Sequence, residues 1–198
     1  MSVVVVLGIV ASVAAVGGNL VGLLLSVRYE QLQYPHFTIS HVLRTTPGLH
    51  AVAFGWQLFT ACYSVLSWIF HVSLIQCGLV YWARVRAGIT VALVTLMSVI
   101  HTVPLPSTPG SKRQIELLHY TVATSYALTG VAESYVTVIR IEPLLDDVNI
   151  PGRWVRVMIV LVSPLWGMVG VLMFLGSWYK NDTYTAIGSG LEFVLICI

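Results

Sequence analysis

Long stretches without a charged side chain constrain this chain more than any other feature of its sequence. Residues 45–83 contain no Asp, Glu, Lys or Arg, and neither do residues 1–27, 87–111 and 157–179. A helix that crosses the hydrocarbon layer of about 30 Å needs about 20 predominantly apolar residues. Charged residues make up only 9% of the chain, whereas a soluble domain carries about 25%. The sequence therefore predicts a membrane protein.

The lengths and positions of these stretches predict an all-α fold, in which residues 1–198 form one polytopic transmembrane helix bundle with six spans. The spans are expected at about 3–25, 49–76, 87–103, 115–139, 154–178 and 183–198. The charges of Arg84 and Arg86 favour a short connection before the third span, and Pro164 predicts a kink in the fifth. The sixth segment is short for a crossing, which is consistent with a chain cut inside its last helix.

Small residues in the first span indicate where another helix approaches closely. Gly8, Gly17, Gly18 and Gly22 give this span a face without bulky side chains. In membranes, helix pairs pack through such faces because lipid-facing apolar residues provide no hydrophobic driving force between helices. We therefore expect the first span to contact a neighbour through its glycines.

Two carboxyl groups fall inside predicted spans, Glu133 and Glu192. A carboxyl group in hydrocarbon is costly and marks a candidate functional site. His119, Tyr126 and Glu133 are spaced by seven residues, which puts them on one helix face that we call the polar stripe. Three interpretations of the stripe stay open: an interhelical hydrogen-bond seam, a pocket for a lipid headgroup, and an ion or proton path. The residues considered as partners of Glu192 are Asn19, Gln57, His71 and Gln76.

No known catalytic or metal-binding motif stands out in the sequence. His36 and His41 are five residues apart, which is not the i, i+4 spacing of a helical metal pair. We expect no metal and no cofactor. The catalytic residues, if there are any, are unknown, so whether the chain is an enzyme stays open.

Several short motifs resemble, in order and spacing, a family of six-helix membrane proteins. They are Pro35, Ile39-Ser40, Pro47 and Phe54 around the first connection, His119, Ala123 and Gly130 in the fourth span, Arg156 before the fifth, and Glu192-Phe193 in the last. The family comprises the damage-regulated autophagy modulators, the FGF-receptor-activating protein and the post-GPI-attachment fatty-acid-remodelling factor. Two positions depart from its pattern: His41 follows the Ile-Ser pair in place of an acidic or small polar residue, and Glu133 replaces the usual Tyr or His.

The resemblance implies an endomembrane protein (Golgi, ER or lysosome) or a plasma-membrane protein that influences lipid composition or membrane traffic. Our first hypothesis is a protein that binds or helps remodel membrane lipid, in GPI-anchor lipid maturation or in autophagy and lysosome regulation. In this hypothesis His36, Ser40, His41 and Arg44 meet a phosphorylated headgroup, with Arg44 donating charge-assisted hydrogen bonds.

Two alternatives stay open beside the lipid hypothesis. One is a non-enzymatic membrane subunit of a larger complex, and the other is an ion or proton channel or transporter that uses the intramembrane acids. The expected partners are membrane lipids and other membrane proteins, with no nucleic acid. We expect the N-terminus to be cytosolic.

Overall fold

The computed structural model describes residues 3–29, 42–102, 112–145 and 153–197, and this part of the chain is built from helices. The six long helices are α1 (Val3–Arg28), α3 (Thr46–Gln76), α4 (Val80–Thr102), α5 (Arg113–Tyr135), α6 (Arg153–Tyr179) and α7 (Asp182–Cys197). α5 continues through a π-helical turn, η1 (Val136–Ile141), and a 3-10 turn, η2 (Glu142–Leu144). The predicted all-α fold is confirmed.

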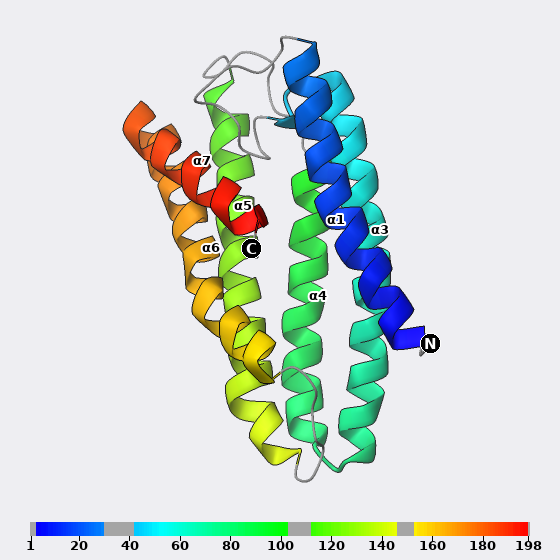
Figure 1. Ribbon diagram of the computed structural model, residues 1–198. Coiled ribbons are helices and arrows are strands. Elements are labelled where there is room, and N and C mark those ends of the chain that lie inside the picture. Colours follow the sequence, from blue (N-terminus) through cyan, green and yellow to red (C-terminus); the bar gives the residue numbers. More distant parts are fainter. Residues whose placement is uncertain (1–2, 30–41, 103–111, 146–152, 198) are drawn as a thin grey trace.

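The helices form an elongated bundle in which chain neighbours lie side by side and run in opposite directions (Figure 1). α1 and α3 pair at one edge, α4 and α5 occupy the middle, and α6 and α7 form the other edge. Within the described part of the chain, extensive contact between long helices is confined to those that follow each other in the chain, α3 with α4 and α5 with α6 included. α7 runs back along the bundle and stops near the middle of its height (Figure 1).

Four helices are long and apolar enough to cross a membrane: α1, α3, the Val80–Ile100 part of α4 and the Val160–Tyr179 part of α6. α5 carries several polar side chains, and α7 has only 16 residues. The chain is therefore a membrane protein, and six crossings stay a prediction. Pro164 lies inside α6, and the kink expected there also stays a prediction.

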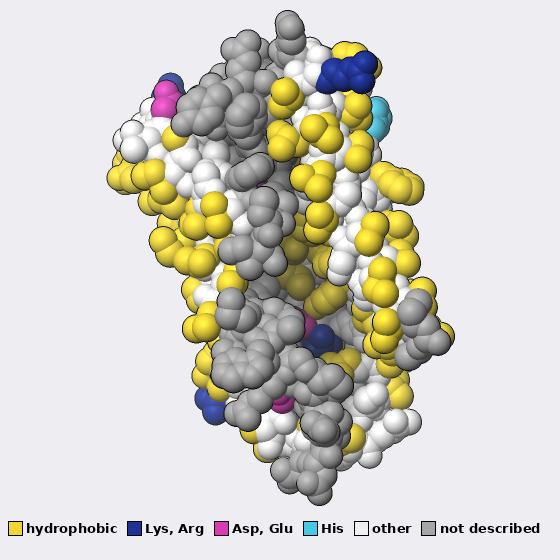
Figure 2. Space-filling view, viewed as in Figure 1, with side chains coloured by type: hydrophobic (Ala, Val, Ile, Leu, Met, Phe, Trp, Pro, Cys, Tyr) yellow, Lys and Arg dark blue, Asp and Glu magenta, His cyan; other side chains and the backbone are white. Residues whose placement is uncertain are grey.

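Large apolar side chains cover the outside of the bundle (Figure 2). On α1, Val13 is 64% exposed and Leu24 is 69% exposed, and on α3 Phe54 and Trp68 are exposed to a similar extent. A soluble protein rarely leaves so large an apolar surface in contact with water. Lipid chains are the solvent that suits this surface.

α1 and α3 approach closely because small residues face each other along their contact. A Cβ atom added to Gly18 would lie 2.9 Å from the Cα of Gly55, and one added to Gly22 would lie 2.7 Å from Cγ2 of Val52. The expected role of Gly18 and Gly22 is therefore confirmed. Added Cβ atoms at Gly8 and Gly17 would meet nothing within 4 Å, so these two glycines lie outside the contact.

Gly78 ends α3, and α4 begins earlier than the sequence predicts. Gly78 has φ of +77°, and the backbone N–H of Leu79 donates to the carbonyl of Leu74 at 2.9 Å, as in a Schellman C-cap. α4 begins immediately afterwards, at Val80. Arg84 and Arg86 therefore lie within a helix and not in the connection that their charge suggested.

Replacing Gly55 by Val is expected to separate α1 from α3. A Cβ atom at this position would lie 2.8 Å from the Cα of Gly18 and even closer to the carbonyl oxygen of Ala14. Overpacking of this kind typically costs about 1–3 kcal/mol. We expect a clearly lower melting temperature for the detergent-solubilised protein. Gly17→Val is the control, since its side chain would enter open space, and equal melting temperatures for the two variants would contradict the contact.

Candidate functional site

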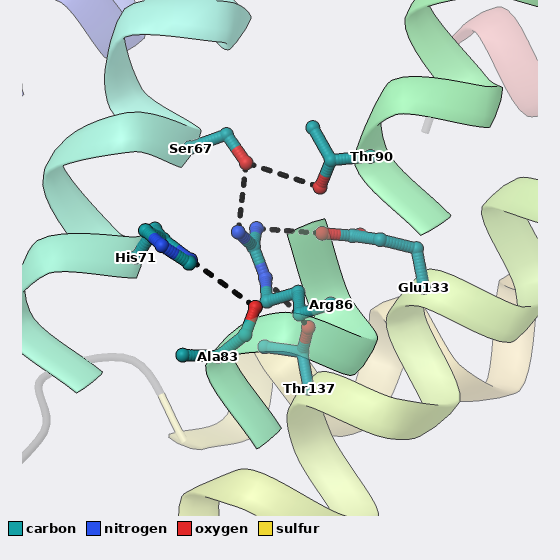
Figure 3. Close-up of polar contacts among 7 residues, drawn as sticks. All are labelled: Ser67, His71, Ala83, Arg86, Thr90, Glu133 and Thr137. Atoms are coloured by element: carbon teal, nitrogen blue, oxygen red, sulfur yellow. Dashed lines mark hydrogen bonds and ion pairs between the residues drawn. The ribbon is translucent and has the colours of Figure 1, made fainter. Parts of the chain in front are cut away.

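Arg86, the first of two buried arginines, is held by polar groups from three helices (Figure 3). It lies on α4 and is 8% exposed. Its Nη2 is 2.6 Å from Oε1 of Glu133 on α5, and its Nη1 donates to Oγ of Ser67 on α3 at 2.7 Å. Its Nε donates to Oγ1 of Thr137 in η1 at 3.3 Å. All the nitrogen atoms of the guanidinium group are thus matched by acceptors.

Further aromatic and polar groups surround this ion pair. The guanidinium carbon of Arg86 lies 4.7 Å from the ring centre of Phe70, which is a cation–π distance. Oγ of Ser67 also shares a hydrogen bond with Oγ1 of Thr90 at 3.1 Å. Nearby, Nδ1 of His71 lies 3.1 Å from the carbonyl oxygen of Ala83 (Figure 3). A charged pair inside a membrane is tolerated when its hydrogen bonds are satisfied in this way.

The second buried ion pair lies at the other end of α5. Arg44, in the turn before α3, has its Nη1 2.9 Å from Oε1 of Glu116, and the two side chains are 6% and 7% exposed. Tyr120, one helical turn after Glu116, lies within interaction range of Arg44, Glu116 and Glu192. Glu116 and Glu133 are about 25 Å apart along the helix, so the two ion pairs hold α5 near its two ends.

A cavity of about 290 Å³ lies between these ion pairs. Its walls come from α3, α4, α5, α6, α7 and the turn before α3, and most of the lining atoms are apolar. The small residues Ala123, Ala127 and Gly130 of α5 face it. Glu192, itself 8% exposed, lines it from α7 and is the sole Asp, Glu, Lys, Arg or His among the described lining residues.

The polar stripe does face the bundle interior, but its three members lie in different surroundings. His119 is 1% exposed and packs edge-on against Tyr120, with ring centres 5.5 Å apart. Tyr126 lines the cavity and lies edge-on to Trp56 at 6.3 Å. Glu133 pairs with Arg86. The stripe is therefore not one continuous hydrogen-bonded row.

The remaining predicted site residues are placed only in part. His36, Ser40 and His41 lie outside the described residues. Asn19, considered as a partner of Glu192, accepts a hydrogen bond from Nε1 of Trp56 at 2.9 Å. Arg44, expected to contact a lipid headgroup, forms an ion pair with Glu116.

Sequence reasoning missed Arg86 and Glu116 as members of the site. The sequence predicts a connection at Arg86 because a charge beside an apolar run normally marks a membrane boundary. Glu116 follows Lys112 and Arg113 closely and resembles an ordinary solvated charge at a helix start. One signal was available: each buried carboxyl needs a cation, and Arg44, Arg84 and Arg86 directly border charge-free runs.

No group of three or more His, Cys, Asp or Glu side chains is arranged to hold a metal ion within residues 3–29, 42–102, 112–145 and 153–197. Comparison of the chain with protein-family models, curated protein sequences and solved structures found no match. The resemblance to the six-helix family therefore stays an expectation from the sequence.

The Arg86–Glu133 pair generates a double-substitution prediction. Arg86→Gln or Glu133→Gln alone leaves a buried charge without its partner, which typically costs about 3–5 kcal/mol in the free energy of unfolding. The double variant removes both charges, so we expect it to be more stable than either single variant. Denaturant unfolding in detergent micelles measures all three.

Arg84→Gln is the matched control for these variants, because Arg84 is an exposed arginine on the same helix. Its loss is expected to change stability by less than about 0.5 kcal/mol. Purely additive effects of the two single substitutions at positions 86 and 133 would show that the pair contributes no coupling energy.

Proposed function

We propose that this chain is a multi-pass membrane protein with six spans that binds membrane lipid inside its helix bundle. The observation that carries the proposal is the apolar cavity of about 290 Å³ between the two buried ion pairs. Sites for small apolar molecules are concave, mostly apolar and carry few polar groups. The cavity has this composition, with Glu192 as the one acidic side chain in its described lining.

The volume supports an occupant with a hydrocarbon chain. An engineered apolar cavity of about 150 Å³ binds benzene, and this cavity has nearly twice that volume. In a membrane, the molecules available to fill such a space are the lipids themselves. The aromatic and small side chains on its walls, Trp56, Tyr126 and Gly130 among them, give a chain both contact area and room.

The two buried ion pairs support a binding role over an ion path. A proton carrier has to exchange protons during transport, whereas Glu133 is paired at 2.6 Å with Arg86, which is itself held by a hydrogen bond to Ser67. Arg44 is likewise occupied by Glu116, which argues against Arg44 as the main contact of a phosphorylated headgroup. Arg44 and Arg86 thus hold α5 in position, and the cavity between the two ion pairs is the proposed site for the ligand.

A more specific proposal concerns the cellular location of the protein and the pathway in which it acts. We place the protein in the endomembrane system with a cytosolic N-terminus and connect its lipid binding to GPI-anchor lipid maturation or to autophagy and lysosome regulation. This extension rests on the motifs around Ile39-Ser40 and on His119, Ala123 and Gly130. Cells that lack the protein should then show altered GPI-anchor lipids or altered autophagic turnover. Unchanged values of both would remove this extension.

Gly130→Leu is expected to reduce the amount of lipid that co-purifies with the protein. A Cβ atom at Gly130 would meet only Cδ1 of Leu93 at 3.8 Å, an ordinary contact, so a longer side chain can extend into the cavity. We expect native mass spectrometry of the gently extracted protein to show about tenfold weaker lipid binding, equivalent to ~1.4 kcal/mol.

Gly88→Leu on α4 is the matched control, because its added side chain meets no atom within 4 Å of the Cβ position. It should retain the lipid of the unaltered protein. Equal lipid occupancy in both variants would contradict the proposal. Stoichiometric partner proteins without any bound lipid would favour the role of a subunit in a larger complex.

A further inference from the structure

We infer that the cavity holds one extended hydrocarbon chain of about 12 to 16 carbon atoms, and that its fixed ends make it select lipids by the length of that chain. This inference rests on the proposed lipid-binding function and adds the class of ligand, an unbranched acyl or alkyl chain in place of a sterol. It depends on the volume of the cavity, on its length along α5 and on the groups beyond its two ends.

The volume of the cavity has room for one chain. A cavity of about 150 Å³ takes a benzene molecule, which corresponds to about 25 Å³ for each carbon atom. By this measure the cavity of about 290 Å³ holds about 12 carbon atoms. A sterol, or both chains of a diacyl lipid, needs about twice that space or more. The volume therefore favours one hydrocarbon chain.

The cavity is elongated along α5. Tyr120 and Ser134 both line it, and they are separated by about 21 Å along the helix axis. Leu93 and Ile100 of α4 follow the same space on the opposite wall, with Leu93 close to Gly130. A fully extended chain advances about 1.2 Å per bond, so about 16 carbon atoms span this distance. A long and narrow space of this kind suits a straight chain better than a ring system.

The two buried ion pairs lie directly beyond the ends of the cavity. Ser134 follows Glu133 of one pair in the sequence, and Tyr120 lies one helical turn after Glu116 of the other. To extend the cavity past either end, a pair would have to separate and leave a buried charge without its partner. The length available to a chain is therefore fixed by the fold.

The two ends of the cavity differ in polarity, which gives the chain a direction. Tyr120 lies within interaction range of Glu192, and both residues line the cavity. A hydroxyl and a carboxyl group are polar in either protonation state. At the other end the described lining, with Gly130 and Val131, is apolar apart from the hydroxyl group of Ser134. We expect the polar end of the lipid beside α7 and its methyl end near Gly130.

Packing, and not transfer from water, makes the cavity sensitive to chain length. Lipid tails and the cavity wall are similarly apolar, so the gain from leaving water cancels when binding is expressed per membrane-bound molecule. A chain that is too short leaves empty space, and the lining atoms lose contacts. A chain that is too long has to bend or leave carbon atoms outside. Binding is therefore expected to be strongest at an intermediate length.

Octyl, dodecyl, hexadecyl and eicosyl alcohols with a photoactivatable group near the methyl end, together with a photoactivatable sterol, test this inference. The purified full chain is placed in phosphatidylcholine vesicles, and labelling is expressed per membrane-bound probe. We expect the dodecyl and hexadecyl alcohols to label peptides of α5 and α6 that line the cavity about tenfold more strongly than the other three probes, equivalent to ~1.4 kcal/mol. Equal labelling by all chain lengths, or stronger labelling by the sterol, would overturn the inference.

Ser134→Phe should shorten the cavity at the end beside Glu133. We expect labelling by the hexadecyl alcohol to fall to the level of the eicosyl alcohol, with labelling by the dodecyl alcohol nearly unchanged. Ala132→Phe is the matched control, because Ala132 is exposed on the same helix and is not among the described lining residues. It should keep the chain-length preference of the unaltered protein.

Retained labelling by the dodecyl alcohol would show that the Ser134→Phe variant is folded. A folded variant that still binds the hexadecyl alcohol as strongly as the unaltered protein would overturn the inference. Since the series of chain lengths is measured on the unaltered protein, the inference is tested even where the variant does not fold.

Gly130→Leu separates the failure of this inference from the failure of the proposed function. If that variant reduces labelling by all the alcohols but no chain length is preferred in the unaltered protein, the cavity binds lipid and only the inference on chain length fails. If Gly130→Leu leaves all labelling unchanged, the cavity is not the site and both fail.

Discussion

Neutralisation of buried charge is the constraint on which the rest of this structure depends. Removing a guanidinium and a carboxylate from water costs several kcal/mol per ion, and this cost is offset only when the two groups pair closely and their hydrogen bonds are satisfied. Arg86 meets that condition with Glu133 and the hydroxyl groups of Ser67 and Thr137, and Arg44 pairs closely with Glu116. Both carboxylates lie on α5, so this helix is fixed to α4 at one end and to the turn before α3 at the other. A shift of α5 along its axis would break both pairs.

The cavity follows from how α5 is fixed. Between its two paired carboxylates, α5 presents Ala123, Ala127 and Gly130 to the interior, and side chains of this size do not fill the space among the surrounding helices while the ion pairs hold the helix ends. Beside the cavity α5 and α6 approach closely, since a Cβ atom at Gly170 of α6, which also lines the cavity, would lie 3.0 Å from the Cα of Thr124. The cavity thus lies next to a close helix contact.

The parts of this architecture that depend on local sequence were predictable, and those that depend on distant pairing were not. Charge-free runs locate the helices because each span needs its own apolar length, and Gly18 and Gly22 indicate a contact face for the same local reason. The predicted start of the third span, at residue 87, was wrong because Gly78, in a left-handed conformation, ends α3 inside an apolar run. Arg44 and Glu116 are far apart in the chain, so nothing in the local pattern of either residue identifies the other as its partner.

Two carboxylates that look alike in the sequence therefore differ in what they do. Glu133 pairs with Arg86 of α4, which in turn donates to Ser67 of α3 and Thr137 of η1, so its contribution is to the geometry of the bundle. Glu192 is carried by α7, which within the described residues packs extensively against α6 alone, and it lines the cavity. A carboxylate in hydrocarbon requires compensation wherever it lies. At Glu133 the protein supplies that compensation through Arg86 and fixes α4 against α5, whereas Glu192 places a carboxyl group in the wall of a mostly apolar cavity.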